Sequence, residues 1–181
     1  MVPIAVETYS ARWPEQFEEV AESLMRSLSK VEVIAVEHVG STSVQGLAAK
    51  PVLDIDVVVT RENVPGAIEA LVAAGYEHRG DLGVVGREAF LAPDVAPPRN
   101  VYVCEQGTLH LRNHLAVRRI LRDRPDLRDR YAAVKLELAS DPTMDIDRYL
   151  AGKSPILQEV LALSDLSDAE KLEILRLNTR R

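Results

Sequence analysis

The first apolar positions of the chain have the spacing of a helix, and the next ones form the continuous runs of strands. The first set lies at 13, 17, 20, 21, 24, 25 and 28 and recurs every three to four residues. This spacing predicts an amphipathic helix facing a core. Two segments rich in valine and isoleucine follow, VEVIAVEHVG (31–40) and PVLDIDVVVT (51–60), and they predict two strands. The small polar segment STSVQGLAA (41–49) between them indicates a turn with a short helical piece.

The rest of the chain predicts one more helix, three short strands and a helical C-terminal half. Residues 61–75 have helical spacing and end at a glycine. Segments bounded by Gly- and Pro-containing turns indicate strands at 76–80, 87–92 and 100–105. Helical patterns then cover about 108–122, 126–139, 146–162 and 168–177, and SDAE (167–170) matches a capping box for the last of them. The pattern indicates an α+β domain with a small sheet.

Length and composition indicate one soluble domain. A chain of 181 residues with 46% hydrophobic positions can bury a core of its own. The single cysteine, Cys104, excludes an intrachain disulfide and fits a reducing cytosol. No apolar run approaches the roughly 20 residues of a membrane span, and the first residues lack the pattern of a signal peptide. We therefore expect a cytoplasmic protein with no membrane association.

The charge distribution is uneven. The net charge is −6, which argues against general nucleic-acid binding. Residues 107–135 nevertheless carry eight Arg or Lys residues against three Asp. Solvated helix faces are the favoured interpretation, including for Arg112, Arg119 and Lys135. A cationic wall facing a phosphorylated ligand is the alternative.

The tripeptide Asp-Ile-Asp occurs twice, at 54–56 and at 145–147. On a strand, residues i and i+2 point to the same side, so Asp54 and Asp56 would share one face and could hold a cation that prefers oxygen ligands. Their strand is the most apolar of the chain, which indicates a central position where aspartate is otherwise disfavoured. The second pair precedes a helix, where aspartate is favoured as a cap. We therefore assign the metal site to the first pair.

The segment upstream of the first pair adds a phosphate-binding signal. Gly40 and Ser41 form a turn at the start of a short helical piece, which offers backbone N–H groups and a hydroxyl to a phosphate. Twelve residues separate this turn from Asp54. Together, the turn and the carboxylates predict a site for the phosphate tail of a nucleotide.

This segment resembles the GrpB family, within the DNA-polymerase-beta-like nucleotidyltransferase superfamily. The superfamily pattern is matched by Val39-Gly40-Ser41 and by Asp54-Ile55-Asp56-Val57. The closer likeness to GrpB lies in EHVGSTSVQGLAAKPVLDIDV and extends over about residues 8–162. We accordingly expect a GrpB-like domain at 1–165 and a C-terminal helical extension at 166–181. The implied fold is a small mixed sheet flanked by helices.

The resemblance implies nucleotidyl transfer from a nucleoside triphosphate to a small-molecule or protein hydroxyl. Mg²⁺, with Mn²⁺ as the alternative, would be held by Asp54 and Asp56 as the catalytic pair. The remaining expected site residues surround the phosphates: His38, Gly40, Ser41, Thr42 and Lys50. A third carboxylate, which related enzymes carry on a later strand, is missing from NVYVCE (100–105), and Glu88 and Glu105 are the nearest acids.

Three further hypotheses remain open from the sequence. The missing acid favours a non-catalytic nucleotide-binding or partner module that keeps the nucleotidyltransferase fold. His110 and His114 have the i, i+4 spacing of metal-binding histidines, but no glutamate follows His110, so an ordinary helix face is the favoured interpretation. Leu172, Ile174 and Leu175 of the final helix could pack on another subunit as a homodimer.

Overall fold

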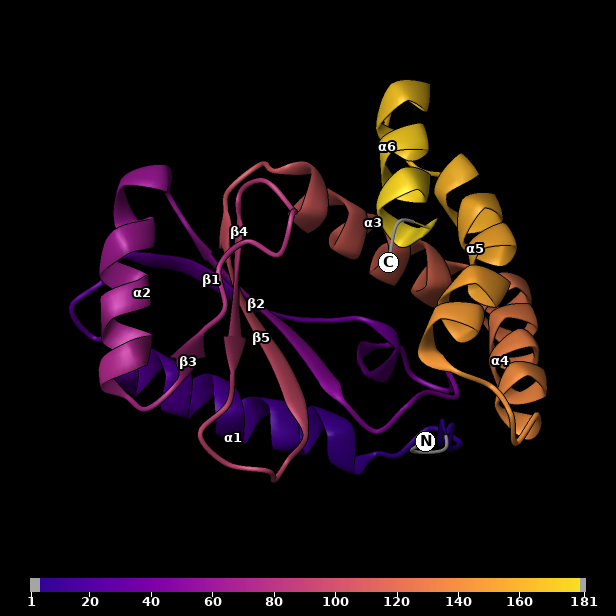
Figure 1. The fold of residues 1–181 in the computed structure, drawn as a ribbon, viewed down its shortest axis with the longest axis horizontal. Coiled ribbons are helices and arrows are strands. Elements are labelled where there is room, and N and C mark those ends of the chain that lie inside the picture. The colour runs from indigo at the N-terminus through magenta and orange to yellow at the C-terminus, as the bar shows by residue number, and fades with distance from the viewer. Residues whose placement is uncertain (1–3, 180–181) are drawn as a thin grey trace.

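The computed structural model describes residues 4–179 and is built on one five-stranded mixed sheet (Figure 1). Its order is β1 (Val33–Val39), β2 (Leu53–Val59), β5 (Arg99–Glu105), β4 (Arg87–Leu91) and β3 (Glu77–His78). Only β2 and β5 are parallel, and the other pairs are antiparallel. The strand that carries Asp54 and Asp56 thus lies inside the sheet, as its apolar sequence predicted.

Two helices cover one face of the sheet. Helix α1 (Arg12–Ser27) and helix α2 (Val64–Ala73) follow the predicted helical spacing, and α2 is preceded by a short 3-10 turn, η2 (Arg61–Asn63). Their apolar side chains bury the alternate β2 residues in the main core, which includes Trp13, Leu24, Leu53, Ile55, Val57, Ala67 and Leu71. The alternation of the strand leaves Asp54 and Asp56 on the opposite face.

The helical half packs at the other side of the molecule (Figure 1). It consists of α3 (Leu109–Asp123), α4 (Pro125–Ser140), α5 (Ile146–Ala162) and α6 (Asp168–Thr179). A second core joins three of these helices to the segment that follows the 3-10 turn η1 (Ser41–Ser43), through residues that include Val44, Leu47, Leu121, Tyr131, Ile156 and Val160. The η1 segment therefore connects the sheet to the helical half, and the predicted α+β class is confirmed.

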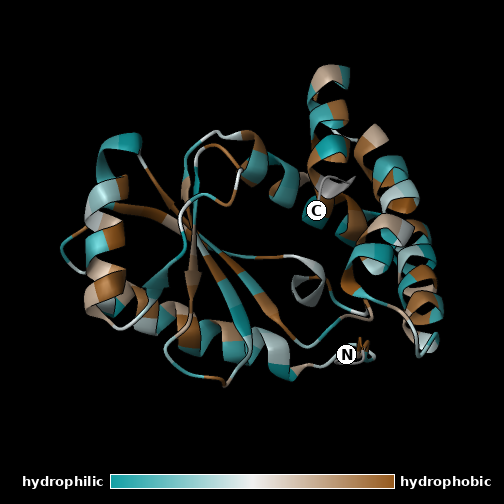
Figure 2. Cartoon of the chain, viewed as in Figure 1, coloured by the Kyte–Doolittle hydropathy of each residue, from teal (hydrophilic) through white to brown (hydrophobic). Residues whose placement is uncertain are grey.

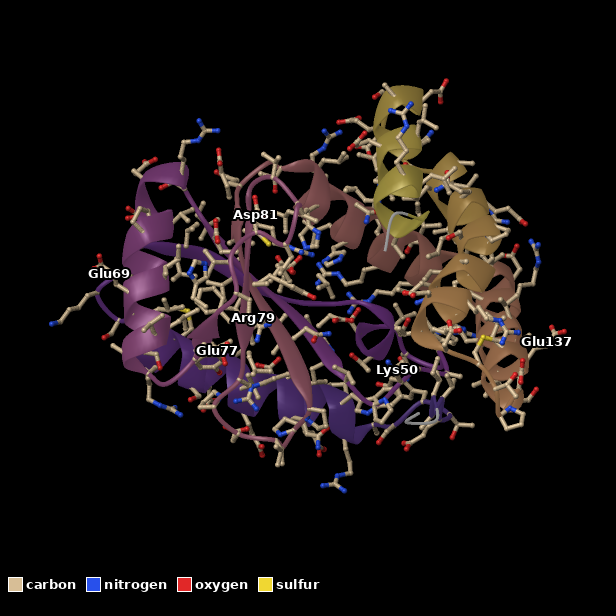
Figure 3. The ribbon with its side chains drawn as sticks, viewed as in Figure 1. Lys50, Glu69, Glu77, Arg79, Asp81 and Glu137 are labelled. Carbon is tan, nitrogen blue, oxygen red and sulfur yellow. The ribbon has the colours of Figure 1, made fainter. Side chains whose placement is uncertain are left out.

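The apolar and polar faces of the elements are visible in the hydropathy colouring (Figure 2). Charged side chains such as Glu69 on α2 and Glu137 on α4 are exposed and project away from the molecule (Figure 3). Among the described residues, no helix has the length and apolar character that a membrane crossing requires.

Two sequence signals for helix starts are confirmed. Asp145 caps α5, where its carboxylate accepts a hydrogen bond from the Arg148 N–H at 2.8 Å. At the start of α6, the Ser167 N–H donates to the Glu170 carboxylate, and the Glu170 N–H donates to the Ser167 hydroxyl. The second Asp-Ile-Asp tripeptide is thus accounted for by capping. The predicted strand at 76–80 is shorter than expected, because pairing covers only β3 at the sheet edge.

Candidate functional site

Side chains from β2, β5 and α3 meet on the face of the sheet that α1 and α2 leave free. Asp54 and Asp56 lie opposite Asn100 and Tyr102 in the parallel register of β2 and β5. Helix α3 begins shortly after β5 and crosses this face, where Val58, Cys104 and Leu111 form a small core. The crossing brings the first turns of α3 over the two aspartates.

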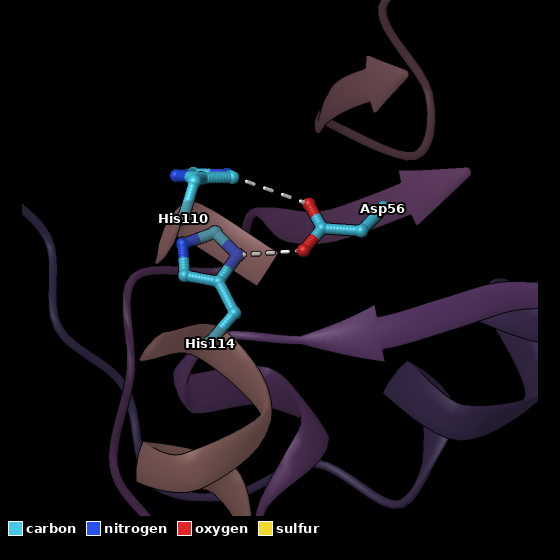
Figure 4. A group of neighbouring side chains, drawn as sticks. All are labelled: Asp56, His110 and His114. Atoms are coloured by element: carbon cyan, nitrogen blue, oxygen red, sulfur yellow. Dashed lines mark hydrogen bonds and ion pairs between the residues drawn. The ribbon is translucent and has the colours of Figure 1, made fainter. Parts of the chain in front are cut away.

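Asp56 is fully buried and faces two histidines of α3 (Figure 4). Its Oδ2 lies 2.8 Å from His114 Nδ1, and its Oδ1 lies 3.8 Å from His110 Nε2. Burial alone would raise the pKa of Asp56, but the adjacent His114 and His110 outweigh it and hold that pKa well below its ordinary value. Burial lowers the pKa of His114, whereas the Asp56 carboxylate raises it, and the net direction is upward. Asp56 and His114 therefore form a charged pair.

His110 behaves differently from His114. Burial lowers the pKa of His110, so it is neutral at pH 7. Its ring lies 4.0 Å from the His114 ring, centroid to centroid, and contacts Tyr102 edge-on. Within the described residues, neither His110 Nε2 nor Asp56 Oδ1 has a hydrogen-bond partner, although both atoms are buried. The favoured sequence interpretation of an ordinary helix face is therefore wrong for this histidine pair.

Asp54 lies next to this cluster and is half-buried. Its Oδ1 accepts a hydrogen bond from the Asn100 amide at 2.8 Å, and burial raises its pKa. Asn100 thus stands beside Asp54 on β5, the strand on which the sequence resemblance implies a third acid. Glu88 binds His78 and Glu105 binds Arg61, both on the far face of the sheet. The structure therefore supplies no third carboxylate from these two candidates.

The Gly40–Ser41 turn packs directly against Asp54. Gly40 has a φ of 68° and a ψ of −170°, a conformation that favours glycine. A Cβ atom added at this position would overlap the Asp54 carboxylate. Only glycine therefore lets the turn approach the aspartate so closely, and the two sequence motifs are brought together.

Gly40→Ala is expected to lower stability and to displace Asp54. The substitution combines backbone strain of about 1–2 kcal/mol with a steric overlap against a side chain on an interior strand. Gly107→Ala is the matched control, because Gly107 has a φ of 80° but open space where the Cβ would go. In thermal unfolding, Gly40→Ala should lose clearly more stability than Gly107→Ala. Equal losses would mean that the approach to Asp54 is not required.

Two other predicted site residues lie behind the turn. His38 Nε2 is 2.9 Å from the Thr42 hydroxyl, and the His38 ring stacks on Phe17. Burial, with Arg122 and Arg118 nearby, lowers the pKa of His38 to about 4. Thr42 is buried and its hydroxyl lies 3.4 Å from the Val52 carbonyl. These contacts position the turn, and direct ligand binding by His38 and Thr42 stays a prediction.

Two lysines of the helical half, Lys135 and Lys153, each stand over a tyrosine ring. Lys135 of α4 is 1% exposed, and its Nζ stands over the Tyr131 ring with no hydrogen-bond partner in the described structure. Burial, together with Lys153, lowers the pKa of Lys135 to about 7. Lys153 of α5 is half-buried over the Tyr149 ring, and burial lowers its pKa to about 8 although Asp54 opposes the shift. The expectation of a solvated surface role for Lys135 is therefore wrong.

The Tyr131 ring connects Lys135 to the turn. Tyr131 lies close to the Ser41 side chain, and burial raises the pKa of Tyr131 above its ordinary value. Lys50, the lysine predicted from the sequence, is half-buried (labelled in Figure 3) and lies close enough to Lys153 to lower its pKa. One set of neighbouring groups thus includes Asp54, Tyr131, Ser41 and the lysines Lys50, Lys135 and Lys153. Sequence reasoning treated Lys135 as a surface residue and gave Lys153 no role.

The arginines of α3 and α4 have other partners. Arg118 donates to the His38 carbonyl and pairs with Glu37, and Arg122 donates to the Ser43 carbonyl. These bonds hold the turn against α3. Other arginines of the segment form ion pairs with acids of the helical half: Arg112–Glu170, Arg119–Asp165, Arg124–Asp126 and Arg130–Glu159. Four of these arginines, Arg112, Arg118, Arg119 and Arg122, also line one cavity of about 500 Å³ together with Glu37, Asp123 and Asp165. The alternative of a cationic wall facing a phosphorylated ligand therefore stays a prediction.

A cavity of about 700 Å³ opens beside the aspartates and histidines. Strands β2 and β5, helices α3, α5 and α6 and the segment before β4 form its walls. The lining residues include Asp54, Tyr102, Val84, His110, Leu150 and Ile174. Asp54 lines this cavity and also interacts with Lys153. The aspartate therefore stands at the junction between the lysine-rich side and the cavity.

The predicted Mg²⁺ site fits these residues in part. Mg²⁺ takes oxygen ligands and usually binds one or two carboxylates together with substrate phosphates. Asp54 offers a carboxylate at the wall of the cavity and interacts with Lys153. Asp56 offers carboxylate oxygens as well, but one of them faces His110 Nε2 and the other contacts His114 Nδ1. Donor atoms of Asp56, His110 and His114 all lie within 4.8 Å of one another, a mixed nitrogen and oxygen set that the sequence analysis missed.

Comparisons with known proteins place the chain in a family. The model of the GrpB protein family matches residues 3–163. The UPF0157 protein YqkA of Bacillus subtilis is 35% identical over 80% of this chain, which spans 42% of that relative. The UPF0157 protein BH1888 of Halalkalibacterium halodurans is 36% identical over 84% of this chain and 78% of its own.

Solved structures give the same result. The GrpB protein from Enterococcus faecalis matches with a TM-score of 0.75 and 34% identity, over 87% of this chain and 98% of that one. A chain of the GLD-2/RNP-8 complex and the Cid1 poly(U) polymerase match with TM-scores of 0.52 and 0.51, at 13% and 11% identity. They cover 96% and 91% of this chain, and 69% and 54% of their own. These distant matches show a shared nucleotidyltransferase-like fold alone. The chain belongs to the GrpB protein family.

Proposed function

We propose that this protein binds a nucleoside triphosphate with a divalent cation and transfers its nucleotidyl group to a hydroxyl acceptor. One observation carries the proposal: the buried Lys135 stands over the Tyr131 ring, which neighbours Ser41, and the half-buried Lys153 lies close to Asp54. An ammonium group buried without an anion destabilises the folded protein. A bound anion would pair with the ammonium group and offset this cost.

A triphosphate has the charge and shape for this side of Asp54. The Ser41 hydroxyl and the two ammonium groups can all donate to phosphate oxygens. A divalent cation at Asp54 and Asp56 would bridge the same phosphates and neutralise charge that develops during displacement. The cavity on the other side of Asp54 provides the space for a nucleoside or an acceptor, with the apolar Leu150 and Ile174 in its wall.

The transfer reaction balances as an in-line displacement. The acceptor hydroxyl oxygen bonds to the α-phosphorus, and the bond from that phosphorus to the β-bridging oxygen breaks. Pyrophosphate leaves with the electron pair, and the hydroxyl proton is released. Lys135 and Lys153 would hold the leaving pyrophosphate and stabilise its added charge.

A second candidate function is nucleotide binding without transfer. Asn100 favours it, because the position beside Asp54 carries an amide that donates a hydrogen bond instead of a carboxylate that could hold a second metal ion. This candidate keeps the phosphate contacts of Lys135 and Lys153. It differs from the first in that no pyrophosphate is released.

Binding is tested by thermal unfolding with each of the four ribonucleoside triphosphates and Mg²⁺. A ligand at 100 times its Kd adds about 2.7 kcal/mol of stability, which corresponds to a rise in Tm of about 5–10 °C. The double substitution Asp54→Asn with Asp56→Asn should remove this rise. Asp145→Asn with Asp147→Asn is the matched control, because the second Asp-Ile-Asp caps α5 and should keep the rise.

Transfer is tested separately with triphosphates labelled at the α-phosphate. Pyrophosphate release and a labelled acceptor from a mixture of small hydroxyl compounds would establish the enzyme. A Tm rise without pyrophosphate release would establish the binding module. The absence of a Tm rise with all four triphosphates would refute both.

A further inference from the structure

The three groups Asp56, His110 and His114 have the arrangement of ligands around one ion (Figure 4). Asp56 comes from an interior strand, and the histidines stand one helical turn apart on α3. Residues i and i+4 of a helix lie on the same face, so both rings turn toward the carboxylate. The backbone of two regular elements therefore holds all three donors.

The donor atoms of this cluster are incompletely satisfied. Asp56 Oδ1 and His110 Nε2 are buried, lie 3.8 Å apart and have no hydrogen-bond partner among the described residues. A buried carboxylate oxygen without a partner is unfavourable. A cation between these atoms would satisfy both, because imidazole nitrogen and carboxylate oxygen are both metal ligands.

We propose that Asp56, His110 and His114 bind one divalent first-row transition metal ion of the Zn²⁺ or Co²⁺ type. Imidazole nitrogen suits these ions, whereas Mg²⁺ requires oxygen ligands. Metal–ligand distances of about 2.0–2.2 Å place the ligand atoms of a tetrahedral site about 3.4 Å apart. The hydrogen bond of 2.8 Å between Asp56 and His114 would open slightly, and the 3.8 Å gap to His110 would close slightly.

The site has an open side. His110 and His114 both line the cavity of about 700 Å³, which gives an ion access and leaves coordination positions for water or a ligand. Three protein ligands with an open position are typical of reactive zinc sites. Two charges face the cluster: Asp54 stabilises a cation there, and the Arg87 guanidinium opposes one.

This inference goes beyond the proposed function and is tested without a nucleotide. The purified protein is stripped with a chelator, dialysed and titrated with Zn²⁺ alone and with Co²⁺ alone. We expect one equivalent of metal to remain after equilibrium dialysis, and bound Co²⁺ to show the visible absorption of a site with nitrogen ligands. An excess of Mg²⁺ should not displace either ion.

Two ligand variants and a matched control complete the test. His110→Gln and His114→Gln should each weaken Zn²⁺ binding by more than about 10-fold, since even changes around the ligands have effects of about 10–100-fold. His78→Gln is the matched control, because His78 also contacts a carboxylate, that of Glu88. It should leave Zn²⁺ binding unchanged, since His78 is not part of the ligand group found among the described residues. Circular dichroism of each variant checks folding.

Several outcomes would overturn the proposal. Wild-type protein that retains no stoichiometric Zn²⁺ or Co²⁺ would show that His114 serves only as the counter-ion of Asp56. Unchanged Zn²⁺ affinity in His110→Gln and His114→Gln, or a loss in His78→Gln, would place the metal elsewhere. A Tm rise with Mg²⁺ and triphosphate, together with no Zn²⁺ binding, would reject this site and leave the proposed function intact.

Discussion

Replacing Lys135 with methionine is expected to stabilise the protein at pH 7 and to abolish its stabilisation by nucleoside triphosphates. The Lys135 side chain is 1% exposed, and burial lowers its pKa from 10.5 to about 7. A difference of one in pKa corresponds to about 1.4 kcal/mol. Methionine has a similar length, packs well against an aromatic ring such as Tyr131 and carries no charge to bury.

The stability gain should depend on pH in a defined direction. The folded pKa of Lys135 lies below its unfolded value, so the unfolded chain binds the additional proton between about pH 7 and 10.5. The destabilisation in the wild type is complete below pH 7 and fades as the pH rises toward 10.5. We expect a gain of about 1–4 kcal/mol for Lys135→Met at pH 7, and a smaller gain at pH 9.

Denaturant unfolding at both pH values and thermal shifts with Mg²⁺ and triphosphate measure the two effects. Lys30→Met is the control, because Lys30 is exposed and its loss should change neither stability nor ligand response. A variant that is less stable than the wild type would mean that the ammonium is paired in the folded protein. A variant that keeps the ligand-induced rise would remove Lys135 from the phosphate site.

The fold was largely predictable because its signals are local. Runs rich in valine and isoleucine, with the turns that bound them, located the strands, and helical apolar spacing located the helices. The reciprocal bonds of Ser167 and Glu170 follow from a motif of four consecutive residues. The pairing of Gly40 with Asp54 could also be anticipated from the spacing of two motifs. Each of these features depends on residues that are close in sequence or on two strands that follow one another along the chain and pair.

The parts of the site that were missed depend on how distant elements cross. His110 and His114 have the spacing of a ligand pair, but the third ligand, Asp56, is more than fifty positions away on β2. Lys135 has the sequence neighbourhood of an exposed helix residue, and only the packing of α4 on α5 and the η1 segment buries it. Sequence reasoning assigns a helix face from the polarity of nearby residues. The position of Lys135 within an otherwise apolar stripe of its helix is the one signal that could have identified it as buried.

The affinity for triphosphate is expected to fall on the order of 100-fold between pH 7 and pH 9. The pKa of Lys135 is about 7 and that of Lys153 about 8 in the unliganded protein. A bound phosphate raises both values, so binding takes up protons and weakens as the pH rises through them. Phosphate esters lose their second proton near pH 6, so the ligand keeps its full charge across this range.

Other groups near the lysines do not reproduce this trend. Burial raises the pKa of Tyr131 and of Tyr149, so both phenols stay protonated. Burial also raises the pKa of Asp54, whose ionisation with rising pH would strengthen cation binding and act in the opposite direction. Among these groups, only the two lysines produce a loss of affinity above pH 7.

Isothermal titration with one triphosphate and Mg²⁺ in buffers of different ionisation enthalpy measures both the affinity and the proton uptake. Lys153→Arg is the informative variant, because arginine stays protonated throughout this range. In this variant the fall in triphosphate affinity between pH 7 and pH 9 should be about tenfold smaller, and the remaining fall should be the one that Lys135 causes. If the wild-type affinity stayed constant from pH 7 to pH 9 with no proton uptake, the phosphates would be bound away from both lysines. The Gly40–Ser41 turn would then have to bind the triphosphate without them, and the low pKa of Lys135 would be a feature of the helical core alone.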